Sequence, residues 1–196
     1  MTKDTKQHIF DAAKELFAKQ GYDGVSMRKL AKQANISLSA IYHYYSDKDI
    51  MLQEIFDATN TQLGKDRAML KMRQTMSEAL QDRLEFQFEH MGEIAFVLKY
   101  YLHNRDQFRQ NETGFVPEKT SLHIEEVLLL GRELGELRED IDIRREAKVI
   151  THAINGFVLE IYPAILSPKD TAKIIQDLHR FIMRSIAKEG QGVPMS

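Results

Sequence analysis

Apolar residues recur along the chain at the spacing of an α-helix, and no stretch carries the signals of a strand. Near the start they occupy positions i, i+3, i+4, i+7 and i+8, and Gly21 follows where a left-handed helix cap belongs. The positions are Ile9, Ala12, Ala13, Leu16 and Phe17. No proline precedes Pro117, so the first part of the chain lacks an obligatory helix breaker. The pattern predicts an all-α protein.

Short helices are predicted in the opening stretch after the first one. Ser26 is an N-cap for a second helix of about two turns, and Ser37 caps a third that runs from Leu38 to about Tyr44. Residues 34–36 connect the two, and a connection of this length is characteristic of a helix-turn-helix.

Longer helices are predicted in the rest of the chain. A fourth helix begins at a cap from Ser46 or Asp47. Patterns of roughly fifteen to twenty residues follow, at about 68–91, 93–109, 117–135, 145–163 and 168–188. These lengths are typical of a helical bundle. We therefore expect a helix-turn-helix domain at residues 1–48 and a helical domain at residues 49–196.

The amino-acid composition excludes several kinds of functional site. The chain contains no cysteine, which excludes disulfides and thiolate sites and favours a reducing compartment. The N-terminus lacks the apolar centre of a signal peptide, and no window approaches eighteen consecutive apolar residues. We therefore expect a cytoplasmic protein with no membrane partner.

Charge is distributed unevenly along the chain. The net charge is −2, yet residues 1–48 contain 8 Lys and Arg against 5 Asp and Glu, and residues 49–196 contain 19 against 24. The basic excess coincides with the helix-turn-helix pattern, which favours a polyanionic partner, although chance fluctuation gives the same modest excess.

The third predicted helix has the profile of a helix that docks on DNA. Ser37, Leu38, Ser39 and Ala40 fill its first turn, where exposed N–H groups attract phosphate and short side chains permit close approach to a major groove. Tyr42, His43 and Tyr44 follow with hydrogen-bond donors, and Lys48, Ser26 and Arg28 can also reach phosphate. Ile41 and Tyr45, four residues apart, are expected in the core. For Tyr42, His43 and Tyr44 the alternative to DNA contact is core packing or plain surface exposure.

Residues 21–51, GYDGVSMRKLAKQANISLSAIYHYYSDKDIM, resemble the DNA-binding region of the TetR family of bacterial transcriptional regulators. The positions that carry the resemblance are Phe17, Gly21, Tyr22, Val25, Ser26, Met27, Arg28, Leu30, Ala31, Ala34, Ser37, Ile41, Tyr42, Tyr45 and Lys48. Residues 135–163 are similar to the family's entry into its dimerisation helices. The resemblance implies a repressor that a small-molecule effector releases from double-stranded operator DNA.

The resemblance also implies roles for individual residues of the helix-turn-helix. Phosphate contacts are expected from Ser26, Tyr42, His43, Tyr44 and Lys48, with Ser37 at the helix start. Base-facing positions are expected at Met27, Arg28, Leu38, Ser39 and Ala40. Leu38 stands where the family often has lysine or another polar residue, so an apolar contact, such as with a thymine methyl group, is expected there. Tyr45 stands where the family usually buries a phenylalanine.

A homodimer is expected, because two recognition helices must enter grooves one turn or more apart on a near-palindromic site. The last two helices offer the apolar residues for it. These are Ile150, Ala153, Ile154, Phe157, Ile161, Ile174, Leu178, Phe181 and Ile182. Packing within one subunit is the alternative.

A sensing site is expected among the aromatic residues of the middle helices, because ligand pockets combine apolar walls with a few polar groups. The candidates are Phe86, Met91, Tyr100, His103, Phe108 and Phe115. Plain core packing is the alternative for each. A constitutive DNA binder and an activator also remain open.

An enzyme or metal protein on a helical bundle is the competing class. No histidine has a glutamate three positions before it, HExxH is absent, and no phosphate-binding glycine loop or nucleophile elbow occurs. We therefore expect no catalytic residues, metal or cofactor.

Overall fold

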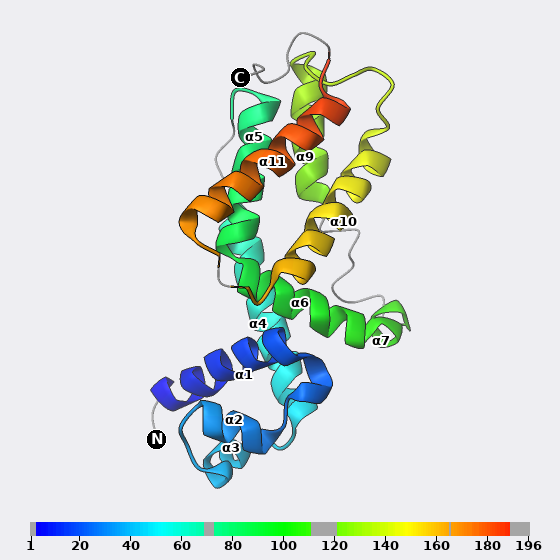
Figure 1. Cartoon of the computed structure of the whole chain (residues 1–196). Helices are drawn as coiled ribbons and strands as arrows, with labels where there is room; N and C mark the ends of the chain where they lie inside the picture. Colours follow the sequence, from blue (N-terminus) through cyan, green and yellow to red (C-terminus); the bar gives the residue numbers. More distant parts are fainter. Residues whose placement is uncertain (1–2, 69–72, 111–120, 165, 189–196) are drawn as a thin grey trace. The chain divides into compact units, whose positions relative to one another are not determined.

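The computed structural model describes residues 3–68, 73–110, 121–164 and 166–188, and these residues form helices joined by short loops (Figure 1). The helices are α1 Lys3–Gly24, α2 Met27–Gln33, α3 Leu38–Tyr44, α4 Lys48–Ala68, α5 Met76–Glu89, α6 Met91–His103, α7 Arg105–Gln110, α9 Leu122–Glu133, α10 Ile143–Ile161 and α11 Pro168–Ile186. The described residues contain no strand, only one isolated bridge between Leu137 and Ala187. The predicted all-α class is confirmed.

Packing divides the chain into two compact units. The first unit comprises Met1–Ala68, His90–Thr113 and Ile161–Pro163, and so contains α1 to α4, α6 and α7. The second unit comprises Met69–Glu89, Gly114–Glu160 and Ala164–Ser196, with α5, α9, α11 and nearly all of α10. The boundary expected after residue 48 stays a prediction about function. In the packing of the chain, α4 and α6 join α1 in the first unit.

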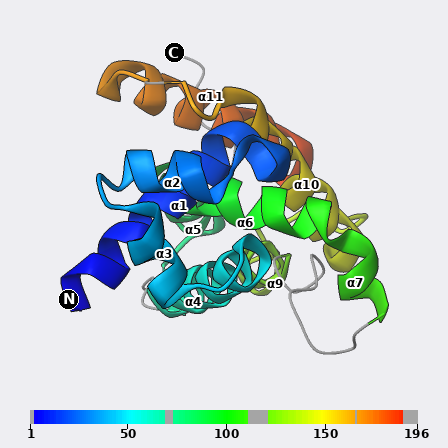
Figure 2. The same ribbon diagram turned by 90° about the horizontal axis from the view of Figure 1, so that it is seen from below.

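Aromatic residues build the core of the first unit. Phe17 of α1 lies 5.2 Å, centroid to centroid, from Phe96 of α6, and Phe56 of α4 lies 4.8 Å from Tyr100 of α6. Ile41 of α3 is completely buried. Figure 2 shows α2 and α3 beside α1 and α4, as their packing requires. Because buried aromatic rings contribute large apolar areas, this core fixes where the two seven-residue helices lie.

The predicted N-caps of the short helices are confirmed. The Ser26 hydroxyl accepts a hydrogen bond from the Lys29 amide at 3.2 Å, and Ser37 accepts one from Ala40 at 3.1 Å. Of the two caps considered for the fourth helix, Asp47 accepts from the Ile50 amide at 2.9 Å. Each cap satisfies an amide that the helix itself leaves unpaired.

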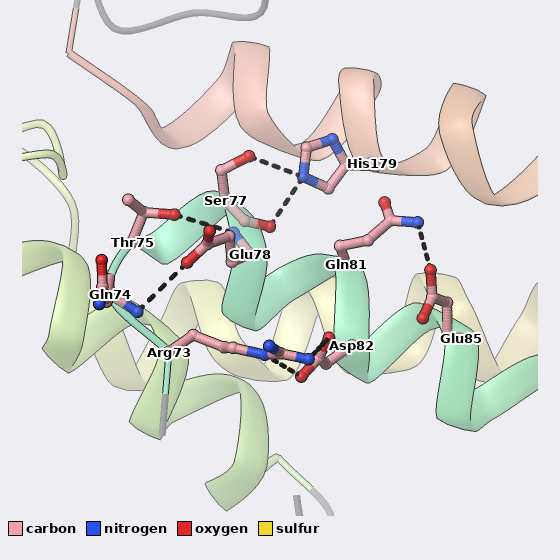
Figure 3. A network of polar contacts seen from close by, with 9 residues as sticks. All are labelled: Arg73, Gln74, Thr75, Ser77, Glu78, Gln81, Asp82, Glu85 and His179. Carbon is pink, nitrogen blue, oxygen red and sulfur yellow. Dashed lines mark hydrogen bonds and ion pairs between the residues drawn. The ribbon is translucent and has the colours of Figure 1, made fainter. Parts of the chain in front are cut away.

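Two predicted helices are wrong in their bounds because local caps interrupt them. The helix expected from residue 68 begins at Met76, where Thr75 caps the first turn and the Glu78 side chain reaches back to the residue before the cap (Figure 3). The Glu78 amide donates to Thr75 Oγ1 at 3.1 Å, and the Gln74 amide donates to Glu78 Oε2 at 3.2 Å. The helix expected at 93–109 divides at Asn104, which caps α6 by donating to the Tyr100 carbonyl.

The remaining helix predictions agree with the structure to within a few residues. α10 and α11 match 145–163 and 168–188 closely. The pattern at 117–135 contains α9, and its first residues, 117–120, lie outside the described residues.

The second unit packs α5 between α9 and α11. His179 of α11 is buried, and its Nε2 lies 3.1 Å from the Ser77 hydroxyl and 3.0 Å from the Ser77 carbonyl of α5 (Figure 3). Gln87 of α5 donates to Asn155 of α10 at 3.0 Å. Polar contacts therefore fix the rotation of α5 against two neighbours. Of the helices described in either unit, none combines the length and apolar character needed to cross a bilayer.

Candidate nucleic-acid interface

The helix-turn-helix consists of α2, a tight turn and α3. Asn35 adopts φ 52°, and the Ile36 amide donates to the Ala31 carbonyl at 3.0 Å, which ends α2 and redirects the chain. Ile41 and Tyr45 are 0% and 2% exposed, so the prediction that they lie in the core is confirmed. These two residues leave the opposite side of α3 exposed.

The exposed side of α3 is polar and aromatic. Ser37, Ser39 and His43 are exposed, Tyr42 is 51% exposed, and Tyr44 is half-buried with its ring against His43. The two serine hydroxyls lie 3.0 Å apart. On α2 and its cap, Ser26 and Arg28 are exposed, and Leu38 on α3 is half-buried. These predicted contact residues are therefore available at the surface.

Two of the residues expected to face bases are buried. Met27 is 8% exposed and Ala40 is 7% exposed, because both point toward the core of the first unit. Their side chains pack within the domain, and their expected contact with bases stays a prediction.

Lys48 has partners within the chain that the sequence did not reveal. Its ammonium donates to the carbonyls of Tyr22 at 3.1 Å and Val25 at 3.3 Å, and lies 3.5 Å from the centre of the Tyr22 ring. An ammonium group has three N–H donors, and the two carbonyls occupy two of them. Lys48 therefore joins the start of α4 to the end of α1.

Carbonyl groups at the end of α1 explain why a lysine side chain lies beside it. Gly21 adopts φ 71°, a left-handed value that breaks the helix and frees carbonyl groups. Lys99 of α6 donates to one of these, the Ala18 carbonyl, and burial lowers the pKa of Lys99. The left-handed conformation of Gly21 is predicted from the sequence. The two lysines that bind the carbonyl groups around it, Lys48 and Lys99, lie far from it in the chain.

Tyr22 lies at the centre of this arrangement. Its hydroxyl donates to the Asp49 carboxylate, and this hydrogen bond, followed by burial, raises the pKa of Tyr22 to about 12. The His103 ring stacks on Tyr22 with centroids 3.8 Å apart and planes 14° from parallel. Since Lys48 and His103 both approach the ring centre so closely, they occupy opposite faces of Tyr22. A three-layer stack, Lys48–Tyr22–His103, thus links α4, α1 and α6.

A cavity of about 590 Å³ adjoins this stack within the first unit. Its lining residues are Tyr22, Asp49, Ile50, Gln53, Glu54, Asp57, Tyr100, His103, Asn104 and Gln107. Burial raises the pKa of Tyr100 to about 12, and its hydroxyl donates to Gln53 Oε1 at 2.8 Å.

The candidate ligand residues are divided between the two units. Tyr100 and His103 line the cavity, and Phe108 packs against Tyr100 with ring centroids 6.3 Å apart. Met91 is half-buried at the start of α6. Phe86 is buried in the second unit, whereas Tyr100, His103 and Phe108 belong to the first unit. Phe115 lies outside the described residues.

The candidate dimerisation residues differ in how far they are exposed. Ile150, Ile154 and Ile182 are buried within the second unit. Ile174 and Leu178 are half-buried, and so is Ile161, which belongs to the first unit. Ala153, Phe157 and Phe181 are exposed, and Phe181 is 70% exposed.

Within the described ranges, no three His, Cys, Asp or Glu side chains lie close enough together to hold a metal ion.

Comparison with known proteins identifies the helix-turn-helix. Residues 9–55 match the family of bacterial regulatory proteins called the tetR family. The chain is 35% identical over 63 residues to the HTH-type transcriptional regulator AcrR of Shigella flexneri, a match covering 32% of this chain and 29% of that protein. It is 26% identical over 155 residues to the fatty acid metabolism regulator protein of Bacillus subtilis, covering 76% and 79%.

Similarity to solved structures extends over nearly the whole chain. A transcriptional regulator from Saccharomonospora viridis, solved in complex with choline, superposes with a TM-score of 0.70 at 17% identity, covering 96% of this chain and all of that one. The sequence matches are shorter: the chain spans about a third of the first curated relatives, 29% of one and 36% of the next. The match over residues 9–55 confirms that the helix-turn-helix resembles the tetR family of bacterial regulatory proteins, and the solved structures share the fold of the chain.

Proposed function

We propose that this protein regulates transcription by binding a specific site on double-stranded DNA through α2 and α3. The observation that carries the proposal is the exposed face of α3, which offers hydroxyl and imidazole donors while Ile41 and Tyr45 anchor the opposite face in the core. Helices of seven residues are not stable alone, so this anchoring sets the geometry that DNA would meet.

Contacts with DNA fall into two groups in this proposal. Arg28, Leu38 and Ser39 read base edges, with Arg28 suited to guanine and Leu38 to a thymine methyl group. Phosphates are bound by the other exposed donors and by the third N–H of Lys48. The donors are Ser26, Ser37, Tyr42, His43 and Tyr44.

A homodimer on a near-palindromic site is the second part of the proposal. Val149 and Phe157 of α10 are 55% and 40% exposed, and Phe181 of α11 is 70% exposed. Large apolar side chains gathered on two amphipathic helices favour a partner surface of the same kind. A second copy of the chain supplies that surface and a second recognition helix.

Release from DNA by a small molecule is the third part. A protein of the same fold from Saccharomonospora viridis binds choline in its structure, and this chain has a cavity next to the helix-turn-helix. A ligand that prefers one conformation of the first unit would shift the population of the DNA-binding state, which makes the protein a ligand-released repressor.

Capture of genomic DNA on the purified chain, followed by footprinting, tests the proposal. We expect protection of a near-palindromic duplex, with affinity that falls at least about tenfold when salt rises from low to physiological concentration, because phosphate contacts release counterions. Absence of binding to any duplex, or affinity independent of salt, would refute it. The gene beside the captured site also indicates whether binding represses or activates.

A further inference from the structure

The cavity of the first unit has the size of a small-molecule site. Its volume of about 590 Å³ lies within the roughly 300–1,000 Å³ that ligand pockets occupy. α4 forms one wall, and the end of α6 with α7 forms another, and α4 and α6 pack directly on each other (Figure 2). Since all the lining residues belong to the same compact unit, one core holds both walls.

Two carboxylates that face this cavity have no positive partner within the described parts of the chain. Asp49 and Asp57 lie on one side of α4, eight residues apart, with Gln53 between them. Asp49 accepts from the Tyr22 hydroxyl, and both oxygens of Asp57 accept from the Gln53 amide at 3.1 Å, so both hydrogen bonds come from neutral donors. Among the described residues, no lysine or arginine lines the cavity. The third acid, Glu54, differs because Lys6 pairs with it at 2.5 Å.

Aromatic faces, in contrast, are already occupied. Lys48 and His103 cover both faces of Tyr22, and Tyr100 is only 4% exposed. A quaternary ammonium ion is usually recognised by open aromatic faces. The cavity therefore presents hydrogen-bond acceptors to a cation, and an ammonium group with N–H donors suits them better than a quaternary one.

The spacing of the two aspartates adds a second requirement. Eight residues of α-helix rise by about 12 Å, so one compact ion does not reach both carboxylates. We propose that the cavity binds a linear aliphatic polyamine, with one ammonium group at Asp49, another at Asp57, and the chain between them along Gln53. The side-chain amides of Asn104 and Gln107 on the other wall can accept from inner amine groups.

Binding at Asp49 has a direct route to the recognition helices. Asp49 holds the Tyr22 hydroxyl, and Tyr22 holds Lys48 through its ring and its carbonyl. An ammonium group at Asp49 competes for the carboxylate and so changes how firmly Lys48 is held. The regulatory consequence rests on the proposed function, and by linkage any effect of the amine on DNA affinity equals the effect of DNA on amine affinity.

Calorimetric titration of the full chain with spermidine, at fixed ionic strength and without DNA, tests the site. We expect saturable binding at one site per chain. Asp49→Asn and Asp57→Asn should each weaken it about tenfold, because each removes a charge-assisted hydrogen bond. The matched control is Asp66→Asn: Asp66 accepts from Gln62 at 2.8 Å, the same spacing on the same helix, but does not line the cavity. This control should leave the affinity unchanged.

Several results would overturn the assignment. They are no saturable binding, choline binding as tightly as spermidine, displacement by Mg²⁺ at matched ionic strength, and equal weakening by Asp66→Asn. If an aspartate variant fails to fold in a thermal melt, the choline and Mg²⁺ comparisons on the unaltered chain still decide. DNA binding is measured separately on the captured site without amine. A chain that binds this DNA but not spermidine refutes the polyamine site alone, and one that binds spermidine but no DNA refutes the proposed function alone.

Discussion

The two compact units bury their apolar residues to different degrees. In the first unit the aromatic rings of Phe17, Phe56 and Phe96 form the core, and the exposed side of α3 carries hydroxyl and imidazole groups. In the second unit α10 and α11 leave Phe157 and Phe181 exposed. The first surface suits a hydrated polyanion, and the second suits an apolar partner. We therefore propose DNA contact for the first unit and self-association for the second.

Removing the anchor of α3 should have the largest effect. Ile41→Ala deletes a completely buried side chain, so we expect a loss of about 3 kcal/mol in the free energy of unfolding. Chemical denaturation measures it. Ile50→Ala is the matched control, since Ile50 is 56% exposed and its truncation should change stability little. Equal losses in the two variants would mean that α3 is not held by its buried side.

A charge on the exposed apolar surface of the second unit should have the next largest effect. Phe181→Glu should weaken the proposed dimer by about 2 kcal/mol, or roughly thirtyfold, because a carboxylate replaces a large exposed aromatic side chain on the proposed interface. Analytical ultracentrifugation gives the dimer dissociation constant. Leu129→Glu makes the same kind of change on α9, where Leu129 is 46% exposed. If it weakens the dimer as much as Phe181→Glu does, the interface does not lie on α10 and α11.

Tyr45→Phe should have a smaller effect, of opposite sign. The Tyr45 hydroxyl is buried and has no hydrogen-bond partner among the described residues. Its removal should raise the free energy of unfolding by about 1 kcal/mol, since an unpaired buried hydroxyl is costly. Thermal unfolding measures the gain. Tyr42→Phe, on a residue that is 51% exposed, is the control and should leave the melting temperature unchanged.

Alkaline pH should widen the difference between wild type and Tyr45→Phe. Burial raises the pKa of Tyr45 from 10.0 to about 12. The unfolded chain therefore loses its Tyr45 proton first, and the wild type loses stability as pH rises from 10 to 12. The phenylalanine variant lacks this contribution. A difference between the two that stays constant over this range would show that Tyr45 is solvated in the folded protein.

Local signals in the sequence account for the features that were predicted well. The caps at Ser26, Ser37 and Asp47 each depend on residues three positions apart, and the left-handed Gly21 depends on its own lack of a side chain. The cap at Thr75 is equally local, and the pattern Thr-x-x-Glu could have revealed it.

Long-range packing accounts for what the sequence did not predict. Met27 and Ala40 occupy a docking motif, but their burial depends on helices that lie elsewhere in the chain. The partners of Lys48, at Tyr22 and Val25, are more than twenty residues away. The separation of Phe86 from Tyr100 follows from the division into units, because α5 and α6 are neighbours in sequence but belong to different cores.

The exposed face of α2 and α3 contains Arg28, and a comparison of two arginine variants shows whether this face reads base edges. Binding of the captured site and of an unrelated duplex is compared for wild type, Arg28→Ala and Arg105→Ala at one salt concentration. Arg28 and Arg105 are both exposed arginines of the first unit, but Arg105 lies on α7. We predict that Arg28→Ala weakens binding to the captured site by about 1–3 kcal/mol and reduces the preference for it over the unrelated duplex, whereas Arg105→Ala preserves that preference. Equal losses from the two variants on both duplexes would contradict a base-reading role for this face.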